Sequence, residues 1–76
     1  MITVKIAQNA FSTETTVDES TTTLNQVMTE AGFDPKAATF YLNGDVVTAD
    51  KWDKTFAENG IYENCFLTSI TKATSN

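Results

Sequence analysis

Side chains that could carry out catalysis or bind a metal ion are few in this chain. It has 76 residues with one cysteine and no histidine, so neither a histidine-based nucleophilic triad nor a zinc site of Cys and His ligands can be assembled. Asp50 and Asp53 lie three residues apart and could together bind a hard cation, although such pairs are more often merely solvated. We therefore expect no enzyme activity, no metal and no cofactor.

Three further residues have chemistry that allows two interpretations. Cys65 lies in a predicted strand, without a basic neighbour or a helix start to lower its pKa, so we interpret it as a small core residue rather than a nucleophile. Trp52 and Phe56 are four residues apart on a predicted short helix and could form an exposed aromatic binding site. We favour core packing for both rings, because a domain of this size can hardly spare its only tryptophan.

The charge composition restricts the class of partner. Five lysines, no arginine and ten acids give a net charge of −5, which argues against binding to nucleic acid or to an anionic membrane. No apolar run approaches the roughly 20 residues of a membrane span, and the first residues show no signal or transit pattern. We expect a cytoplasmic protein whose partner is another protein.

The periodicity of apolar residues predicts the elements that position these side chains. Alternation at Ile2, Val4 and Ile6 indicates a strand over 2–7, and a Thr-rich segment over 12–17 returns as an edge strand. A helix over 23–31 follows, opened by a Thr23–Gln26 capping box and closed by Gly32. The remaining expected elements are strands over 39–42 and 45–47, joined by a turn at 43–44, a short helix over 49–57, and a last strand over 65–71.

Length and apolar content predict a single folded domain. The 41% of hydrophobic residues is ample for a core, while 76 residues leave room for only one. We expect this domain to occupy residues 1–72, with a frayed tail over 73–76.

The order of these elements resembles the β-grasp fold, and in particular the ubiquitin-like group that includes the sulfur-carrier proteins. The likeness is carried by segment 2–6, the helix over 23–31, the hairpin over 40–47 and segment 58–61. It implies an α+β domain with a mixed sheet of four to five strands, one main helix across one face and a short second helix. It further implies that the first and last strands are adjacent, parallel and central.

One departure from this group bears on function. Sulfur carriers and conjugated ubiquitin-like proteins end in Gly-Gly, whereas this sequence has no glycine after Gly60 and ends in Asn76. The resemblance therefore implies no activated C-terminus unless the tail is processed, and no active residue can be transferred from the family.

Three functions remain open. The first is a non-catalytic ubiquitin-like module that binds another protein through the open face of its sheet, for which we predict a patch of Lys5, Tyr41 and Leu67. The second is a small acidic inhibitor, from a phage or other mobile element, that blocks a basic surface of a host enzyme. The third is a sulfur-carrier-like protein with a processed tail.

Overall fold

The computed structural model describes residues 1–69 and consists of a mixed five-stranded sheet and one α-helix. The strands are β1 (Ile2–Gln8), β2 (Phe11–Val17), β3 (Phe40–Leu42), β4 (Asp45–Val46) and β5 (Cys65–Ser69). The helix α1 spans Leu24–Ala31, and two 3-10 turns follow β4, η1 (Ala49–Lys51) and η2 (Ala57–Asn59).

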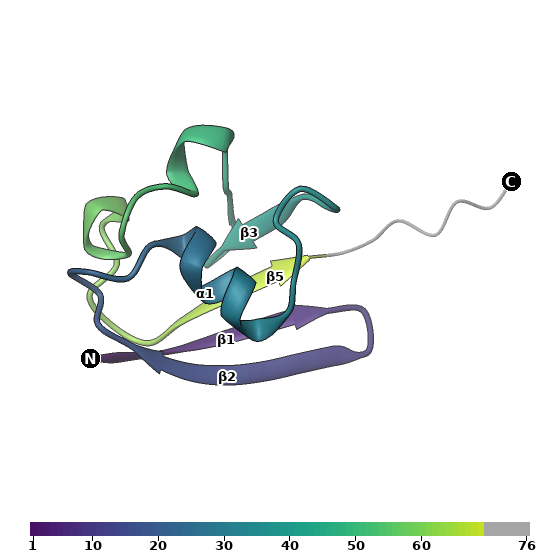
Figure 1. Ribbon diagram of the computed structural model, residues 1–76, viewed down its shortest axis with the longest axis horizontal. Coiled ribbons are helices and arrows are strands. Elements are labelled where there is room, and N and C mark those ends of the chain that lie inside the picture. The colour runs from purple at the N-terminus through teal and green to yellow at the C-terminus, as the bar shows by residue number, and fades with distance from the viewer. Residues whose placement is uncertain (70–76) are drawn as a thin grey trace, which may run out of the picture.

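The sheet has the strand order β2-β1-β5-β3-β4. The first strand, β1, pairs with β2 in antiparallel and with β5 in parallel orientation, so the expectation of adjacent, parallel and central first and last strands is confirmed. The antiparallel hairpin of β3 and β4 completes the other side through β3 and β5. The connection between β1 and β5 includes α1, which lies across one face of the sheet (Figure 1).

The helix begins and ends where the sequence predicts. The Thr23 hydroxyl accepts the Gln26 N–H at 3.1 Å, and the Gln26 side chain accepts the Thr23 N–H at 2.9 Å, which is the reciprocal pattern of a capping box. At the other end Gly32 has φ +85°, and the N–H of Phe33 donates to the Met28 carbonyl at 2.9 Å. The buried residues of α1 are Leu24, Val27 and Met28, which lie at i, i+3 and i+4 and therefore form one face of the helix.

The prediction of a second helix over 49–57 is wrong. The structure has η1 and η2 instead, separated by residues that bond to α1. The carbonyls of Trp52 and Lys54 accept the N–H groups of Asn25 and Leu24 at 2.9 and 3.2 Å, and Thr55 forms an isolated bridge with Thr23. Because these groups satisfy the free amides at the start of α1, the Trp52 and Lys54 carbonyls point toward α1 rather than along a second helix.

The core lies between α1 and the sheet. Both aromatic rings of the 49–57 segment take part, since Phe56 is fully buried and the partly buried Trp52 meets Phe40 edge-on with ring centroids 5.9 Å apart. Core packing of both rings is thus confirmed. The buried cluster comprises Ile2, Val4, Ile6, Val17, Leu24, Val27, Met28, Phe40, Leu42, Val47, Phe56, Cys65 and Leu67.

The predicted end of the last strand at 70–71 and the predicted tail over 73–76 lie outside the described residues.

Candidate functional site

The candidate site is the face of the sheet opposite α1. On β1 the side chains alternate, so that Ile2, Val4 and Ile6 are buried while Lys5 is exposed on the other side. Register then determines which residues of the other strands share the face with Lys5. Phe66 of β5 lies opposite Lys5, and Tyr41 of β3 lies opposite Thr68 of β5 and Val46 of β4. We call Lys5, Tyr41, Val46, Phe66 and Thr68 the open-face patch.

Phe66 is the centre of the open-face patch. It belongs to the third of five strands, and its side chain is 56% exposed. Val46 on the outermost strand is 45% exposed, and Tyr41 between them is partly buried. An aromatic ring, a phenol and an aliphatic side chain thus lie on neighbouring strands of one uncovered face.

The prediction that Leu67 belongs to this patch is wrong. Leu67 is fully buried, because its register partners Ile6 and Leu42 both face α1. Its neighbour Phe66 therefore faces outward and takes the place that was predicted for Leu67. The sequence of β5 alone does not reveal this, since large apolar residues occur at both alternating positions. Lys5 and Tyr41 do lie on the open face, as predicted.

Asn43 fixes the backbone of Phe66. Its N–H donates to the Phe66 carbonyl at 2.9 Å, and its side-chain Oδ1 accepts the Phe66 N–H, also at 2.9 Å. This is possible because the turn that Asn43 makes with Gly44 has positive φ at both residues, +52° and +91°, as predicted from the sequence. The side chain of Asn43 thereby replaces a backbone partner and extends the pairing of β3 with β5 by one residue.

The open face carries little charge. By register, the charged residues on the strands of this face are Lys5 and Glu14, which lie opposite one another on β1 and β2. Lys5 forms no ion pair with any residue of the described chain. The other nine acids of the sequence lie in loops, in η1 and η2, on α1, or in β4 opposite the buried Leu42. The patch therefore has an apolar centre of Tyr41, Val46 and Phe66 with Lys5 as its one charged residue, and the acids of the chain lie mostly outside it.

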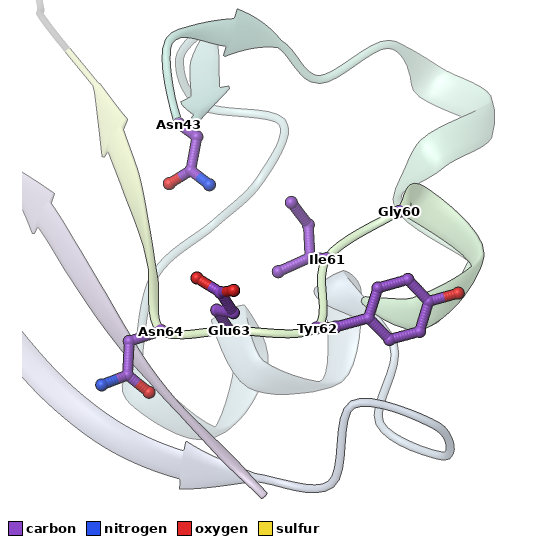
Figure 2. A pocket seen from close by; sticks show the side chains of 6 residues that line it. All are labelled: Asn43, Gly60, Ile61, Tyr62, Glu63 and Asn64. Atoms are coloured by element: carbon purple, nitrogen blue, oxygen red, sulfur yellow. The ribbon is translucent and has the colours of Figure 1, made fainter.

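A shallow hollow of about 240 Å³ lies between the turn at 43–44 and the segment that enters β5. Asn43, Ile61 and Glu63 point toward it, whereas Tyr62 points away (Figure 2). Asn64 borders it and ties the entering segment to β1, because its Oδ1 accepts the Thr3 N–H at 2.8 Å. The hollow is lined by amides and one carboxylate but by no nucleophile, so it can offer hydrogen bonds and no covalent chemistry.

The remaining chemical candidates are Cys65 and the pair of Asp50 and Asp53. Burial raises the pKa of the Cys65 thiol to about 11, which leaves very little thiolate near neutral pH. The Thr48 hydroxyl donates a hydrogen bond to Asp50 at 2.5 Å, and this is the main reason why the pKa of Asp50 lies below its usual range. A backbone hydrogen bond lowers this pKa further, by a smaller amount. Within residues 1–69, no three His, Cys, Asp or Glu side chains are grouped so that they could hold a metal ion.

A capping box at η2 was not predicted. The Thr55 N–H donates to Glu58 at 2.8 Å, and the Glu58 N–H donates to the Thr55 hydroxyl at 3.1 Å. The signal for it, Thr-x-x-Glu over 55–58, is present in the sequence. It matters for the site because η2 leads into the segment that borders the hollow.

Over the described part of the chain, no helix is long and apolar enough to cross a lipid bilayer. Comparison with known proteins identifies no relative: no family model, no curated protein and no solved structure matches this chain.

Proposed function

We propose that this chain is a non-catalytic protein-binding domain of the β-grasp, ubiquitin-like type, and that it binds a partner protein through the open-face patch. The observation that carries the proposal is the exposure of Phe66 at the centre of a sheet face that no helix covers within residues 1–69. The strand order and the parallel pairing of β1 with β5 support the assignment to the β-grasp type. We further propose the cytoplasm as its location.

The exposed ring provides binding free energy. An aromatic side chain has about 200 Å² of surface, so an exposed fraction of 56% leaves about 110 Å² in contact with water. At about 25 cal/mol per Å², covering this area is worth about 3 kcal/mol. That is the contribution of a binding hot spot, and rings of this kind are enriched at the centres of protein interfaces. Tyr41 and Val46 extend the apolar area on the side of β3 and β4.

The charge distribution favours an apolar contact over mimicry of nucleic acid. A mimic needs a dense array of acids on one face, whereas the open face of the sheet carries one acid, Glu14, and one lysine, Lys5. The other acids are interspersed with Lys36, Lys51 and Lys54. The acidic loops are then a border that orients a partner, and binding through the patch itself should resist salt.

The experiment is affinity capture from a lysate of the source cells, with three forms of the full chain and identification of the bound proteins by mass spectrometry. Phe66→Ala removes the centre of the patch, and Phe11→Ala is the matched control, because Phe11 is 73% exposed but lies on the α1 side of β2. Captures are washed at low salt and at about 1 M salt, where the screening length is about 3 Å.

We expect one set of proteins to be retained at high salt by the unchanged chain and by Phe11→Ala, and to be lost with Phe66→Ala. Loss of a hot spot of at least 2 kcal/mol corresponds to binding weakened roughly 30-fold. Equal capture by all three forms would refute the proposal. Capture that disappears in high salt for the unchanged chain would instead favour the acidic inhibitor, and capture of an activating enzyme would favour the sulfur-carrier function.

A further inference from the structure

The chain contains two Asn-Gly dipeptides, Asn43-Gly44 and Asn59-Gly60. Asparagine is chemically labile, and most of all before glycine, because the glycine nitrogen can attack Cγ of the asparagine without a Cβ in its way. Both glycines adopt positive φ, +91° at Gly44 and +80° at Gly60. The two dipeptides are equivalent in sequence, so their hydrogen bonds in the folded chain decide which one reacts.

The reacting groups of Asn43-Gly44 are free. Asn43 is exposed, and its side chain points toward the hollow beside the turn at 43–44 (Figure 2). Within residues 1–69, no hydrogen bond is donated by Asn43 Nδ2, the leaving group, or by the Gly44 N–H, which supplies the attacking nitrogen. The side chain is held only at Oδ1, which accepts the Phe66 N–H at 2.9 Å. At most this single bond has to open for the reaction.

The corresponding groups of Asn59-Gly60 are engaged. Asn59 Nδ2 donates to the Thr55 carbonyl at 2.9 Å and to the Lys51 carbonyl at 3.4 Å, and the Gly60 N–H donates to the Ala57 carbonyl at 2.9 Å. The glycine nitrogen must lose its proton before it attacks, and a hydrogen-bonded amide loses its proton only after local opening. Both the leaving group and the nucleophile are therefore protected at this site.

We propose that Asn43 is a site of spontaneous deamidation in the folded chain. The Gly44 nitrogen gives its proton to a base in the solvent and forms a bond to Cγ of Asn43, while the bond from Cγ to Nδ2 breaks and Nδ2 leaves as ammonia. Water then opens the resulting succinimide ring at one of its two carbonyl carbons. Opening at Cγ gives an aspartyl residue at position 43, and opening at the main-chain carbonyl carbon gives an isoaspartyl residue. One water is consumed and one ammonia is released, without oxidation or reduction.

The two products have different structural consequences. An aspartyl residue keeps an acceptor for the Phe66 N–H and adds a negative charge at the hollow toward which Glu63 also points (Figure 2). An isoaspartyl residue passes the main chain through the former side chain, which lengthens the two-residue turn between β3 and β4 and removes that acceptor. We therefore expect the isoaspartyl form to unfold at a lower urea concentration. This inference does not depend on the proposed function.

The hydrogen bonds also give the expected rates. Each hydrogen bond that has to open slows a reaction roughly 5-fold. Three bonds hold the groups of Asn59-Gly60 and one holds those of Asn43-Gly44, so Asn59 should deamidate roughly 25-fold more slowly than Asn43. Asn9 is a third reference, because it is exposed with φ +56° but is followed by Ala10, whose methyl group obstructs the attack.

The experiment is incubation of the folded full chain in mildly alkaline buffer, followed by cleavage after lysine and mass spectrometry of the peptides. Cleavage separates the three positions, because Asn43 falls in peptide 37–51, Asn59 in 55–72 and Asn9 in 6–36. We expect conversion of amide to acid at Asn43 first, with Asn59 and Asn9 far behind. In urea, which opens the hydrogen bonds, Asn43 and Asn59 should react at equal rates. Conversion of Asn59 as fast as Asn43 in the folded chain, or an unreacted Asn43, would overturn the proposal.

Two further measurements separate this site from general instability. In amide hydrogen exchange of the folded chain, the Gly44 N–H should exchange much faster than the Gly60 N–H, and equal protection would contradict the assigned nucleophile. The variant Asn43→Asp has no amide at this position and should lose the early release of ammonia, whereas Asn9→Asp, the matched control at the other exposed turn, should retain it. Early ammonia release that persists in Asn43→Asp would place the reaction elsewhere.

Discussion

Asn43 stabilises the domain in two separable ways, and substitution at this position tests both. Its side-chain Oδ1 accepts the N–H of Phe66 at 2.9 Å, and its backbone adopts φ +52°. Asn43→Gly keeps the backbone conformation and loses the hydrogen bond, which is worth about 1 kcal/mol at an exposed position. Asn43→Ala loses the hydrogen bond and must also hold a left-handed conformation that costs an alanine roughly 1–2 kcal/mol. Asn43→Asp keeps an acceptor and tolerates this conformation.

These terms predict an order of stability. The free energy of unfolding should fall by about 1 kcal/mol for Asn43→Gly and by about 2–3 kcal/mol for Asn43→Ala, and Asn43→Asp should stay near the unchanged chain. A domain of this length has a total of roughly 4–11 kcal/mol, so the alanine variant loses a large share. Urea titrations followed by the fluorescence of Trp52, the only tryptophan, give the midpoints and slopes.

Two results would refute this reasoning. If the glycine variant is as stable as the unchanged chain, the Asn43–Phe66 hydrogen bond contributes nothing. If the glycine and alanine variants are equally stable, the positive φ at this turn carries no cost for alanine. A change in the slope of the titration would mean that the unfolded or the native ensemble has changed or that unfolding is no longer two-state, and the midpoints would then not be comparable.

Three further predictions concern neighbouring side chains. Leu67→Ala opens a cavity in the core and should lower the free energy of unfolding by about 2–5 kcal/mol, whereas Phe66→Ala removes an exposed ring and should change it by about 0.5 kcal/mol or less. Urea titration of both variants measures these changes, and equal losses would contradict the faces assigned to Leu67 and Phe66. Because the pKa of Asp50 is lowered in the folded chain, its carboxylate should stabilise the fold at pH values above its ordinary pKa of 3.8, and this contribution should be lost as the pH falls through the folded-state pKa. The variant Asp50→Asn should therefore be less stable than the unchanged chain near pH 7 and should lose less stability on acidification. Identical pH profiles of the urea midpoints for the two chains would contradict this prediction. With its pKa raised from 9.0 to about 11, Cys65 should have about 100-fold less thiolate than a free thiol, so it should react correspondingly slowly with an aromatic disulfide until urea unfolds the chain. Labelling of the folded chain as fast as that of the unfolded chain would show that the thiol is accessible.

The parts of the fold that follow from local sequence could be predicted. The side chains of Thr23 and Gln26 accept hydrogen bonds from free N–H groups at the start of α1, and Gly32 ends the helix. These roles could be predicted because each depends only on residues within one or two turns. The turn at 43–44 is equally local, since Asn-Gly accepts positive φ at both positions.

What could not be predicted depends on contacts between distant residues. The face occupied by Leu67 is decided by its register with Ile6, which lies 61 residues earlier, and nothing within β5 specifies it. Likewise, the 49–57 segment has the spacing of a helix, but its carbonyls bond to the start of α1 instead. Phe66 was missed as the centre of the candidate site for the first of these reasons. A single correct pairing between β1 and β5 would have placed it.

The parallel pairing of β1 with β5 also determines when the domain can fold. More than 50 intervening residues join the two central strands, so closing this loop has an entropic cost. Favourable contacts must offset that cost before the middle of the sheet can form. During synthesis, the hairpin of β1 and β2 and the helix α1 emerge first, with their apolar faces incompletely covered until residues 65–69 follow. We therefore expect folding on the slower timescale of non-local topologies, and an interval in which the nascent chain is prone to aggregate.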